Sequence, residues 1–147
     1  MSIKKTLFVL VAIAFSLAWS KGRNSATRLE LQNALVGTHM FGVQFIWDGY
    51  GTAEITEMDG VLKIKGEQFS NNKEEYVLLE GTITVIDERN FMVNGHLKLF
   101  TLGCCGLLDR DINYTFRKTG SRKYYRLKER EDLCSQYTCA YYLDIFE

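Results

Sequence analysis

The fold of this chain is decided by residues 61–101, VLKIKGEQFSNNKEEYVLLEGTITVIDERNFMVNGHLKLFT. Apolar and polar side chains alternate along three runs of this stretch, residues 61–69, 76–87 and 91–101. An alternation with a period of two over such lengths indicates half-buried β-strands. Because short polar segments join the runs, we expect each strand to pair antiparallel with the next.

The alternation continues on both sides of this stretch. Five further strands are expected, over residues 38–48, 51–58, 111–119, 122–129 and 140–147. The side chains expected on the apolar faces are His39, Phe41, Val43, Phe45, Trp47, Ala53, Ile55, Leu62, Ile64, Gly66, Val77, Leu79, Gly81, Ile83, Val85, Phe91, Val93, Gly95, Leu97, Leu99, Ile112, Tyr114, Phe116, Tyr141, Leu143 and Ile145. Eight strands with one apolar face each predict an all-β protein, an up-and-down antiparallel barrel or a sandwich.

Three glycines favour the barrel. Gly66, Gly81 and Gly95 each lie in mid-strand on the apolar face of three consecutive strands. A glycine there gives up packing, and barrels use such residues to bend their strands and close. Two other interpretations remain open: the glycines leave space for a ligand inside the barrel, or they are unrelated to one another.

The N-terminus has the pattern of a secretory signal peptide. Residues 1–20, MSIKKTLFVLVAIAFSLAWS, combine two early lysines, an apolar run over residues 7–17 and small residues before a cut after Ser20. A membrane anchor is the alternative, but the apolar run is shorter than the roughly 20 residues that span a bilayer. We therefore expect an exported protein, periplasmic or extracellular, with no membrane span in the mature chain.

The mature chain divides into a short leading segment and one domain. Residues 21–37 hold the expected helix, over residues 24–34, with apolar contacts from Leu29, Leu31 and Leu35. Residues 38–147 form the barrel domain. Asp59-Gly60, a two-residue hairpin signal, joins its second and third strands.

Four cysteines, an even number in an exported chain, predict disulfides. They are Cys104, Cys105, Cys134 and Cys139. A bond between the two adjacent cysteines would be strained, so pairings that join residues 104–105 to Cys134 and Cys139 are preferred. Adjacent cysteines do not have the spacing of structural zinc ligands, and no C-x-x-C redox motif is present. We predict no metal site and no cofactor.

The charge is balanced, with 18 basic and 18 acidic residues. Residues 116–130, FRKTGSRKYYRLKER, are locally basic and carry two interleaved tyrosines. Such a run binds an anionic polymer or lipid in some proteins, but it is more often the solvated face of a hairpin. It is not the concentrated basic patch of a nucleic-acid surface, so no nucleic-acid partner is predicted.

Catalytic motifs are absent from the sequence. Of the two histidines, His39 is interpreted as a hydrogen-bonded residue at the barrel end, and His96 is expected on the outward face. Asp48, Glu54, Glu57 and Asp59 include carboxylates that could pair, so a small hydrolase that uses two carboxylates stays a third hypothesis. We expect no enzyme.

The turn FIWDGYG, residues 45–51, is the most interesting surface feature. Aromatic side chains at the mouth of a barrel suit an apolar or sugar-like ligand, although Trp47 is also placed to plug the barrel end. The ligand-binding residues predicted on this ground are Trp47, Tyr50, His39, Phe41 and Tyr114.

The segment LVGTH, residues 35–39, leads a short helix into the first strand of a meander, which resembles the layout of lipocalin-like (calycin) barrels. Gly37 and Thr38 match the glycine and the variable position of the lipocalin opening motif, and His39 stands where lipocalins have tryptophan. The run GTHMFGVQFIWDGYGTAEITEMDGVLKIKGEQ, with KTGSRKYYRLKE and YYLDIF, also resembles a family of uncharacterised exported bacterial proteins. That resemblance implies no activity.

Two functions follow as expectations. The first is a lipocalin-like, non-catalytic binding protein for a small apolar ligand or a protein partner. The alternative is an inhibitor or interaction protein of the cell envelope with a filled barrel. The volume inside the barrel separates them: an empty apolar cavity at the glycines favours the ligand, and a core filled by Phe41, Phe45, Phe91, Tyr114 and Phe116 favours the partner.

Overall fold

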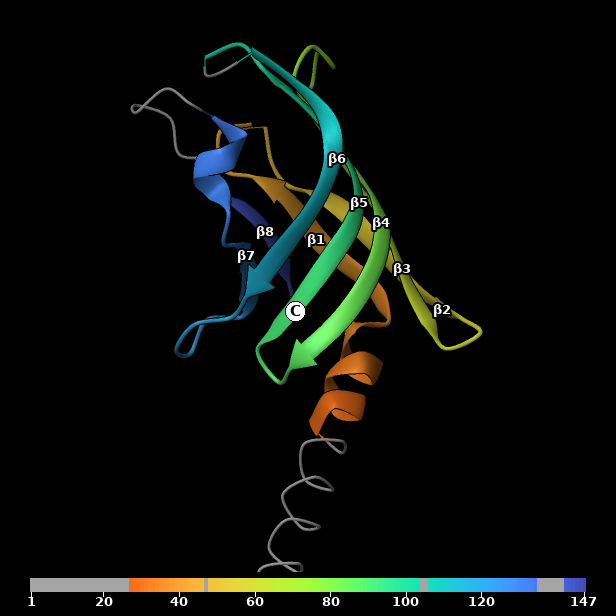
Figure 1. Ribbon diagram of the computed structural model, residues 1–147. Coiled ribbons are helices and arrows are strands. Elements are labelled where there is room, and N and C mark those ends of the chain that lie inside the picture. The colour runs from red at the N-terminus through yellow and green to blue at the C-terminus, as the bar shows by residue number, and fades with distance from the viewer. Residues whose placement is uncertain (1–26, 47, 104–105, 135–141) are drawn as a thin grey trace, which may run out of the picture.

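The computed structural model describes residues 27–46, 48–103, 106–134 and 142–147. In this part of the chain eight strands form one closed barrel, in which each strand pairs antiparallel with the next and β8 pairs with β1 (Figure 1). The strands are β1 (Gly37–Val43), β2 (Gly51–Met58), β3 (Val61–Phe69), β4 (Tyr76–Asp87), β5 (Asn90–Thr101), β6 (Gly106–Arg117), β7 (Tyr124–Leu127) and β8 (Leu143–Phe146). The predicted up-and-down barrel is confirmed, and the sandwich is excluded.

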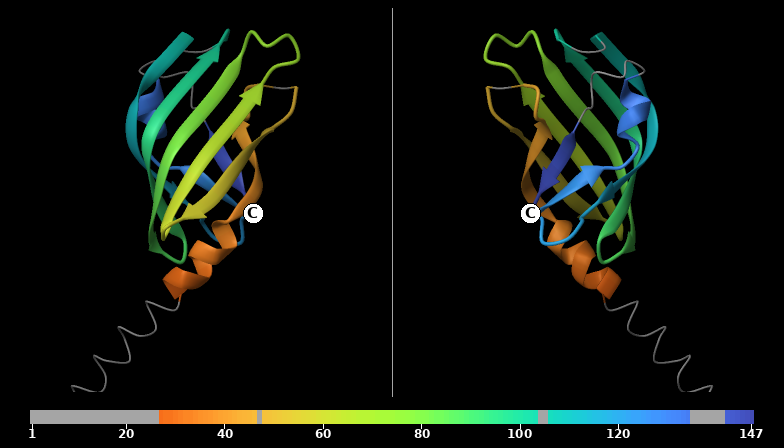
Figure 2. Two further views of the ribbon diagram at one scale, coloured as in Figure 1. Left: turned by 90° about the vertical axis from the view of Figure 1, so that its right-hand side faces the viewer. Right: turned by 90° about the vertical axis from the view of Figure 1, so that its left-hand side faces the viewer.

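A helix over residues 27–35 lies at one end of the barrel, beside the hairpin ends of the strands (Figure 2). It buries Leu31 and Leu35 in the core, but Leu29 is 57% exposed and does not make the predicted contact. Leu31 and Leu35 are four residues apart and share one helix face, whereas Leu29 lies on another face. Within the described residues, no helix has the length and apolar character needed to cross a membrane.

The barrel interior is packed with aromatic and branched side chains. Phe41, Phe91 and Phe116 are fully buried. The Phe91 ring stacks on Phe116 with centroids 5.5 Å apart and meets the Tyr125 ring at 5.0 Å. Tyr114 is buried as well, and Phe45 packs against the same core from the turn after β1. The five aromatic residues named as the test of a filled barrel therefore all contribute to the core.

The three mid-strand glycines permit close packing. A Cβ at Gly66 would lie 2.9 Å from the Phe41 ring, so that ring occupies the space of the missing side chain. Gly81 and Gly95 lie directly opposite each other on β4 and β5. A Cβ at Gly95 would come within 2.0 Å of the Glu80 carbonyl oxygen, so the two strands approach more closely there than any side chain allows.

The first strand ends earlier than predicted. β1 stops at Val43, because the buried side chain of Gln68 on β3 takes over the hydrogen bonds that a further strand pairing would use. The Val43 N–H donates to Gln68 Oε1 at 2.7 Å, and Gln68 Nε2 donates to the carbonyl oxygens of Val43 and Gly49. The alternation fails beyond this point: Ile46 is buried, Phe45 is half-buried, and Trp47 lies outside the described residues.

The sixth strand begins earlier than predicted, at Gly106, and the seventh and eighth are shorter. In β6 the inward position opposite Leu97 is held by Arg110, which breaks the apolar pattern. The Arg110 guanidinium donates to the Tyr114 hydroxyl and to the carbonyl oxygen of Asp132, in the 3-10 helix η1 (Arg130–Leu133). Arg110 is exposed to solvent at this position, and its donors find partners beside η1.

The short strands β7 and β8 are joined by an ion pair on the outside of the barrel. Arg126 lies opposite Asp144, and its Nε and Nη2 donate to the two carboxylate oxygens at 2.7 Å each. Asp144 is fully buried, and this pairing raises the pKa of Arg126 further above its usual value. A bidentate pair of this kind holds two strands in register.

The disulfide prediction lies mostly outside the described residues. Cys104, Cys105 and Cys139 are not described, and Cys134 follows η1, where it is half-buried and packs against the core. The pairing of the four cysteines therefore stays a prediction.

Candidate functional site

Four neighbouring strands, β3 to β6, lie side by side in the left view of Figure 2. Their outward side chains form a regular grid. The cross-strand registers place these residues in four rows. The rows are Phe69–Tyr76–Phe100–Leu107, Glu67–Leu78–Lys98–Asp109, Lys65–Glu80–His96–Asp111 and Lys63–Thr82–Asn94–Asn113. We call these sixteen residues the β3–β6 face. From ordinary strand spacings the grid measures about 14 Å across the strands and about 20 Å along them.

The first row is apolar and exposed to solvent. Phe69 is 43% exposed and Leu107 is 59% exposed, with the half-buried Tyr76 and Phe100 between them. The Tyr76 ring lies 6.4 Å from the Phe69 ring and 6.2 Å from the Phe100 ring. A contiguous apolar row on the surface of a monomer is the kind of patch that marks an interaction site.

The character of the face changes row by row away from this edge. The second row mixes charged residues with Leu78, and its Lys98 ammonium lies 3.4 Å from the Asp109 carboxylate. In the third row, Lys65, Glu80, His96 and Asp111 alternate in sign when the histidine is protonated. The fourth row carries a lysine, a threonine and two asparagines. The face therefore grades from apolar to charged to polar within one sheet surface.

His96 lies between two carboxylates. Its Nδ1 is 2.9 Å from Asp111 Oδ1, and its Nε2 is 2.7 Å from Asp109 Oδ1. Only the protonated imidazole can donate from both nitrogens. The hydrogen bond to Asp111, followed by the one to Asp109, raises the pKa of His96, and the bond from His96 lowers the pKa of Asp109. Both ring nitrogens are occupied, so neither is free to act as a general base.

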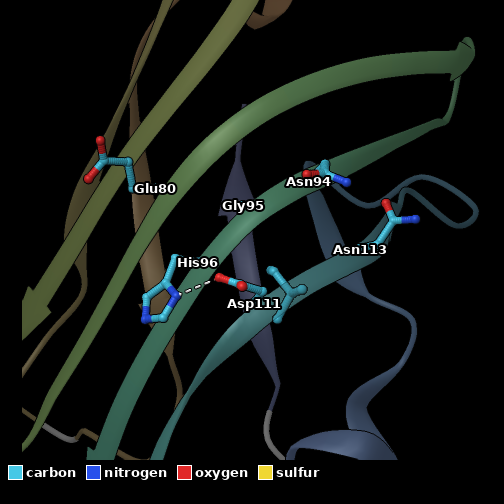
Figure 3. A pocket seen from close by; sticks show the side chains of 7 residues that line it. Glu80, Asn94, Gly95, His96, Asp111 and Asn113 are labelled. Atoms are coloured by element: carbon cyan, nitrogen blue, oxygen red, sulfur yellow. Dashed lines mark hydrogen bonds and ion pairs between the residues drawn. The ribbon is translucent and has the colours of Figure 1, made fainter.

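Depressions mark the outer surface beside the three mid-strand glycines. The depression in Figure 3 is lined by Glu80, Asn94, Gly95, His96, Asp111, Ile112 and Asn113. Two adjoining depressions reach Gly81 and Gly66. Each of the three glycines borders one depression. The residues that permit close packing inside the barrel therefore also line the depressions on its outer surface. Among the described residues, no group of three acidic, histidine or cysteine side chains is arranged to hold a metal ion.

The predicted ligand-binding residues have other contacts. Phe41 belongs to the core, and the Tyr114 hydroxyl receives a hydrogen bond from Arg110. His39 Nδ1 lies 2.8 Å from the Phe146 carbonyl oxygen, and its Nε2 lies 2.7 Å from that of Leu35, as the interpretation of a hydrogen-bonded barrel-end histidine expects.

The two aromatic residues of the predicted mouth are placed differently. Tyr50 packs edge-on against Phe146 at 4.8 Å. Trp47 lies outside the described residues.

Two of the four carboxylates singled out in the sequence have other partners. Asp48 accepts a hydrogen bond from the Asn71 N–H at 2.7 Å, and Glu54 lies opposite Lys65. The carboxylates that do meet at one side chain are Asp109 and Asp111, and the sequence prediction missed them. Continuing the period of two upstream from residue 112 would have placed both on the outward face, opposite Lys98 and His96.

Comparison with known proteins gives one family and one similar sequence. Residues 21–147 match the PM1083 family. The chain is 38% identical, over 120 residues, to the protein from Pasteurella multocida (strain Pm70) named "Uncharacterized protein PM1083". The alignment covers 80% of this chain and 76% of that protein. No solved structure matches this chain.

Proposed function

This chain belongs to the PM1083 family, and we propose that it is an exported, non-catalytic protein that binds a protein partner through the β3–β6 face. The observation that carries the proposal is the row Phe69–Tyr76–Phe100–Leu107, exposed on the outside of a barrel whose inside is packed. We therefore propose a binding surface outside the barrel rather than within it.

The packed interior weighs against a small apolar ligand. A ligand site of that kind needs a concave space of several hundred Å³ lined by apolar side chains. Here the Phe41 ring lies against Gly66, and Gly81 and Gly95 bring two strands together, so the three glycines leave no room of their own. Among the described residues, the Phe41 ring uses the space expected for a ligand at Gly66.

The grading of the face supports a protein partner. Protein interfaces combine a desolvated apolar centre, often aromatic, with a rim of polar and charged groups that supply hydrogen bonds. The first row offers two phenylalanines and a tyrosine, and the rows beside it offer charges of both signs. Mixed charge selects a complementary protein surface more readily than it selects an apolar small molecule.

The hydrogen bonds of His96 and the ion pair of Asp109 support a non-catalytic function. His96 has both nitrogens bound to carboxylates, and Asp109 is also paired with Lys98. A general base or nucleophile needs a free position toward its substrate.

Export is supported by the pattern of residues 1–20 and by a family match that begins at Lys21, directly after the expected cut.

Site-specific photo-crosslinking in the source cell tests the proposal. A benzophenone amino acid at Phe100 should trap one defined protein, whereas the same probe at Met58, which is exposed on β2, should not. Phe100→Glu should abolish co-purification of that protein without changing the melting temperature by more than a few degrees. Equal crosslinking from both positions, or none from Phe100, would overturn the proposal.

A further inference from the structure

A chain of cation–π contacts follows the outside of the seam between β7 and β8, which the right view of Figure 2 faces. Arg122 and Arg126 lie 5.5 and 4.9 Å from the centre of the Tyr124 ring. Arg126 and Arg130 lie 4.4 and 5.3 Å from the centre of the Tyr142 ring. We call these five residues the Arg–Tyr seam. Four of its residues lie in the basic stretch 116–130, and none of the five belongs to the β3–β6 face.

The three arginines of the seam differ in their counter-ions. Arg126 is neutralised by the buried Asp144, which fixes the centre of the seam. Arg122 and Arg130 have no carboxylate within ion-pair distance among the described residues. All 18 acidic residues of the sequence lie in the described part of the chain, so no other segment supplies a hidden partner.

The surroundings add charge of both signs. Lys123 and Lys128 are exposed beside the seam, and neither makes an ion pair with a described residue. Three acidic residues lie next to Arg130: Glu129, Glu131 and Asp132. The Glu129 carboxylate accepts the backbone N–H of Thr115 at 2.8 Å. The basic side chains therefore gather between Arg122 and Lys128, and the acidic ones begin at Glu129.

We propose that the Arg–Tyr seam binds a carboxylate-rich segment of a partner protein. A guanidinium stacked on an aromatic ring keeps its N–H edge available and has already lost part of its rotamer freedom. That edge matches a carboxylate with two parallel hydrogen bonds, as Arg126 shows with Asp144 at 2.7 Å. Arg122 and Arg130 supply the same geometry with no internal acid to satisfy it.

The arrangement favours an extended peptide over a membrane surface. The contacts run along one seam on the side of the barrel, from the turn before β7 to the helix η1 after it, and do not spread over a flat end. An extended acidic segment meets such a line of donors one residue after another. This inference does not rest on the β3–β6 face, and either surface can fail without the other.

A fluorescent oligoglutamate peptide, followed by anisotropy at low ionic strength, tests the inference. Arg122→Gln/Arg130→Gln should weaken binding about tenfold or more, since two charge-assisted hydrogen-bonding groups are lost. The matched control Arg28→Gln/Lys73→Gln removes the same charge from exposed positions outside both the seam and the β3–β6 face, and it should change binding less than about threefold.

A second variant tests whether binding depends on the orientation of the guanidinium groups or only on the total positive charge. Tyr124→Leu/Tyr142→Leu keeps every charge but removes the rings, and it should also weaken binding, with folding checked by a thermal melt. Equal losses in the Arg122→Gln/Arg130→Gln variant and in the control variant would overturn the inference. So would binding to polyphosphate or to phosphatidylglycerol vesicles without binding to the oligoglutamate peptide.

Discussion

Adding a single methyl group at Gly66 or at Gly95 separates the two roles that a mid-strand glycine can have in this barrel. A glycine that leaves space for a ligand accepts alanine, and the protein gains stability. A glycine that permits close packing does not. The perturbations are Gly66→Ala and Gly95→Ala, with Gly103→Ala as the matched control, because a Cβ at Gly103 would meet nothing within 4 Å.

The distances set the expected losses in the free energy of unfolding. At Gly95 the new Cβ would lie 2.0 Å from a backbone oxygen and 2.5 Å from the Gly81 Cα, and backbone cannot rotate away. The strands must separate, at a cost of about 3 kcal/mol or more. At Gly66 the nearest atom, at 2.9 Å, belongs to the Phe41 ring, which can shift, so we expect about 1–2 kcal/mol.

Urea unfolding followed by circular dichroism measures all three variants. Gly103→Ala should stay within about 0.5 kcal/mol of the native protein or gain slightly, because its backbone does not require glycine. If Gly66 faced empty space, Gly66→Ala would instead stabilise the protein by roughly 1 kcal/mol, from a buried methyl and a stiffer unfolded chain. A gain of that size at Gly66, or a loss under about 1 kcal/mol at Gly95, would refute the packing argument.

Three other predictions follow from the same structure. Arg126→Met leaves the buried Asp144 carboxylate without its partner and should cost about 3–5 kcal/mol in urea unfolding; a loss under about 1 kcal/mol would refute its burial. An NMR titration should give His96 a pKa above the usual histidine value, which Asp111→Asn should lower; no change in that variant would contradict the pairing. Because the pKa of His96 is raised on folding, its contribution to stability is complete below the pKa of the unfolded chain and disappears as the pH rises through the folded value. Peptide mapping of exported protein without reducing agent should find all four cysteines in disulfides, and free thiols would reject the prediction.

The barrel could be predicted because the sequence patterns that determine its strands and turns are local. Each strand carries its own period of two, and the Asp59-Gly60 turn has positive φ angles of 54° and 76° at its two residues, as that hairpin requires. The buried positions Leu62, Ile64 and Val93 follow directly from that pattern. The sequence leaves open whether Gly66 and Gly95 permit close packing or leave space for a ligand, and the short distances at both positions favour close packing.

The candidate sites depend on pairings that no single strand reveals. His96 meets Asp109 and Asp111 only because β6 starts at Gly106, and the inward Arg110 hides that start by interrupting the apolar pattern. The partners of Arg110 lie near η1, which the alternation cannot locate.

The Arg–Tyr seam depends on the closure of the barrel in the same way. Arg126 meets both the Tyr142 ring and the buried Asp144 carboxylate because β7 pairs with β8. Long-range register of this kind is a property of the folded sheet rather than of any one segment.

The central claim is that the barrel interior is packed and that binding takes place on its outside. Native mass spectrometry of protein purified from its own source tests that claim most directly. We predict the mass of the polypeptide alone, or of the polypeptide with a protein partner that Phe100→Glu removes. A stoichiometric small apolar molecule that dissociates only when the protein unfolds would contradict the account.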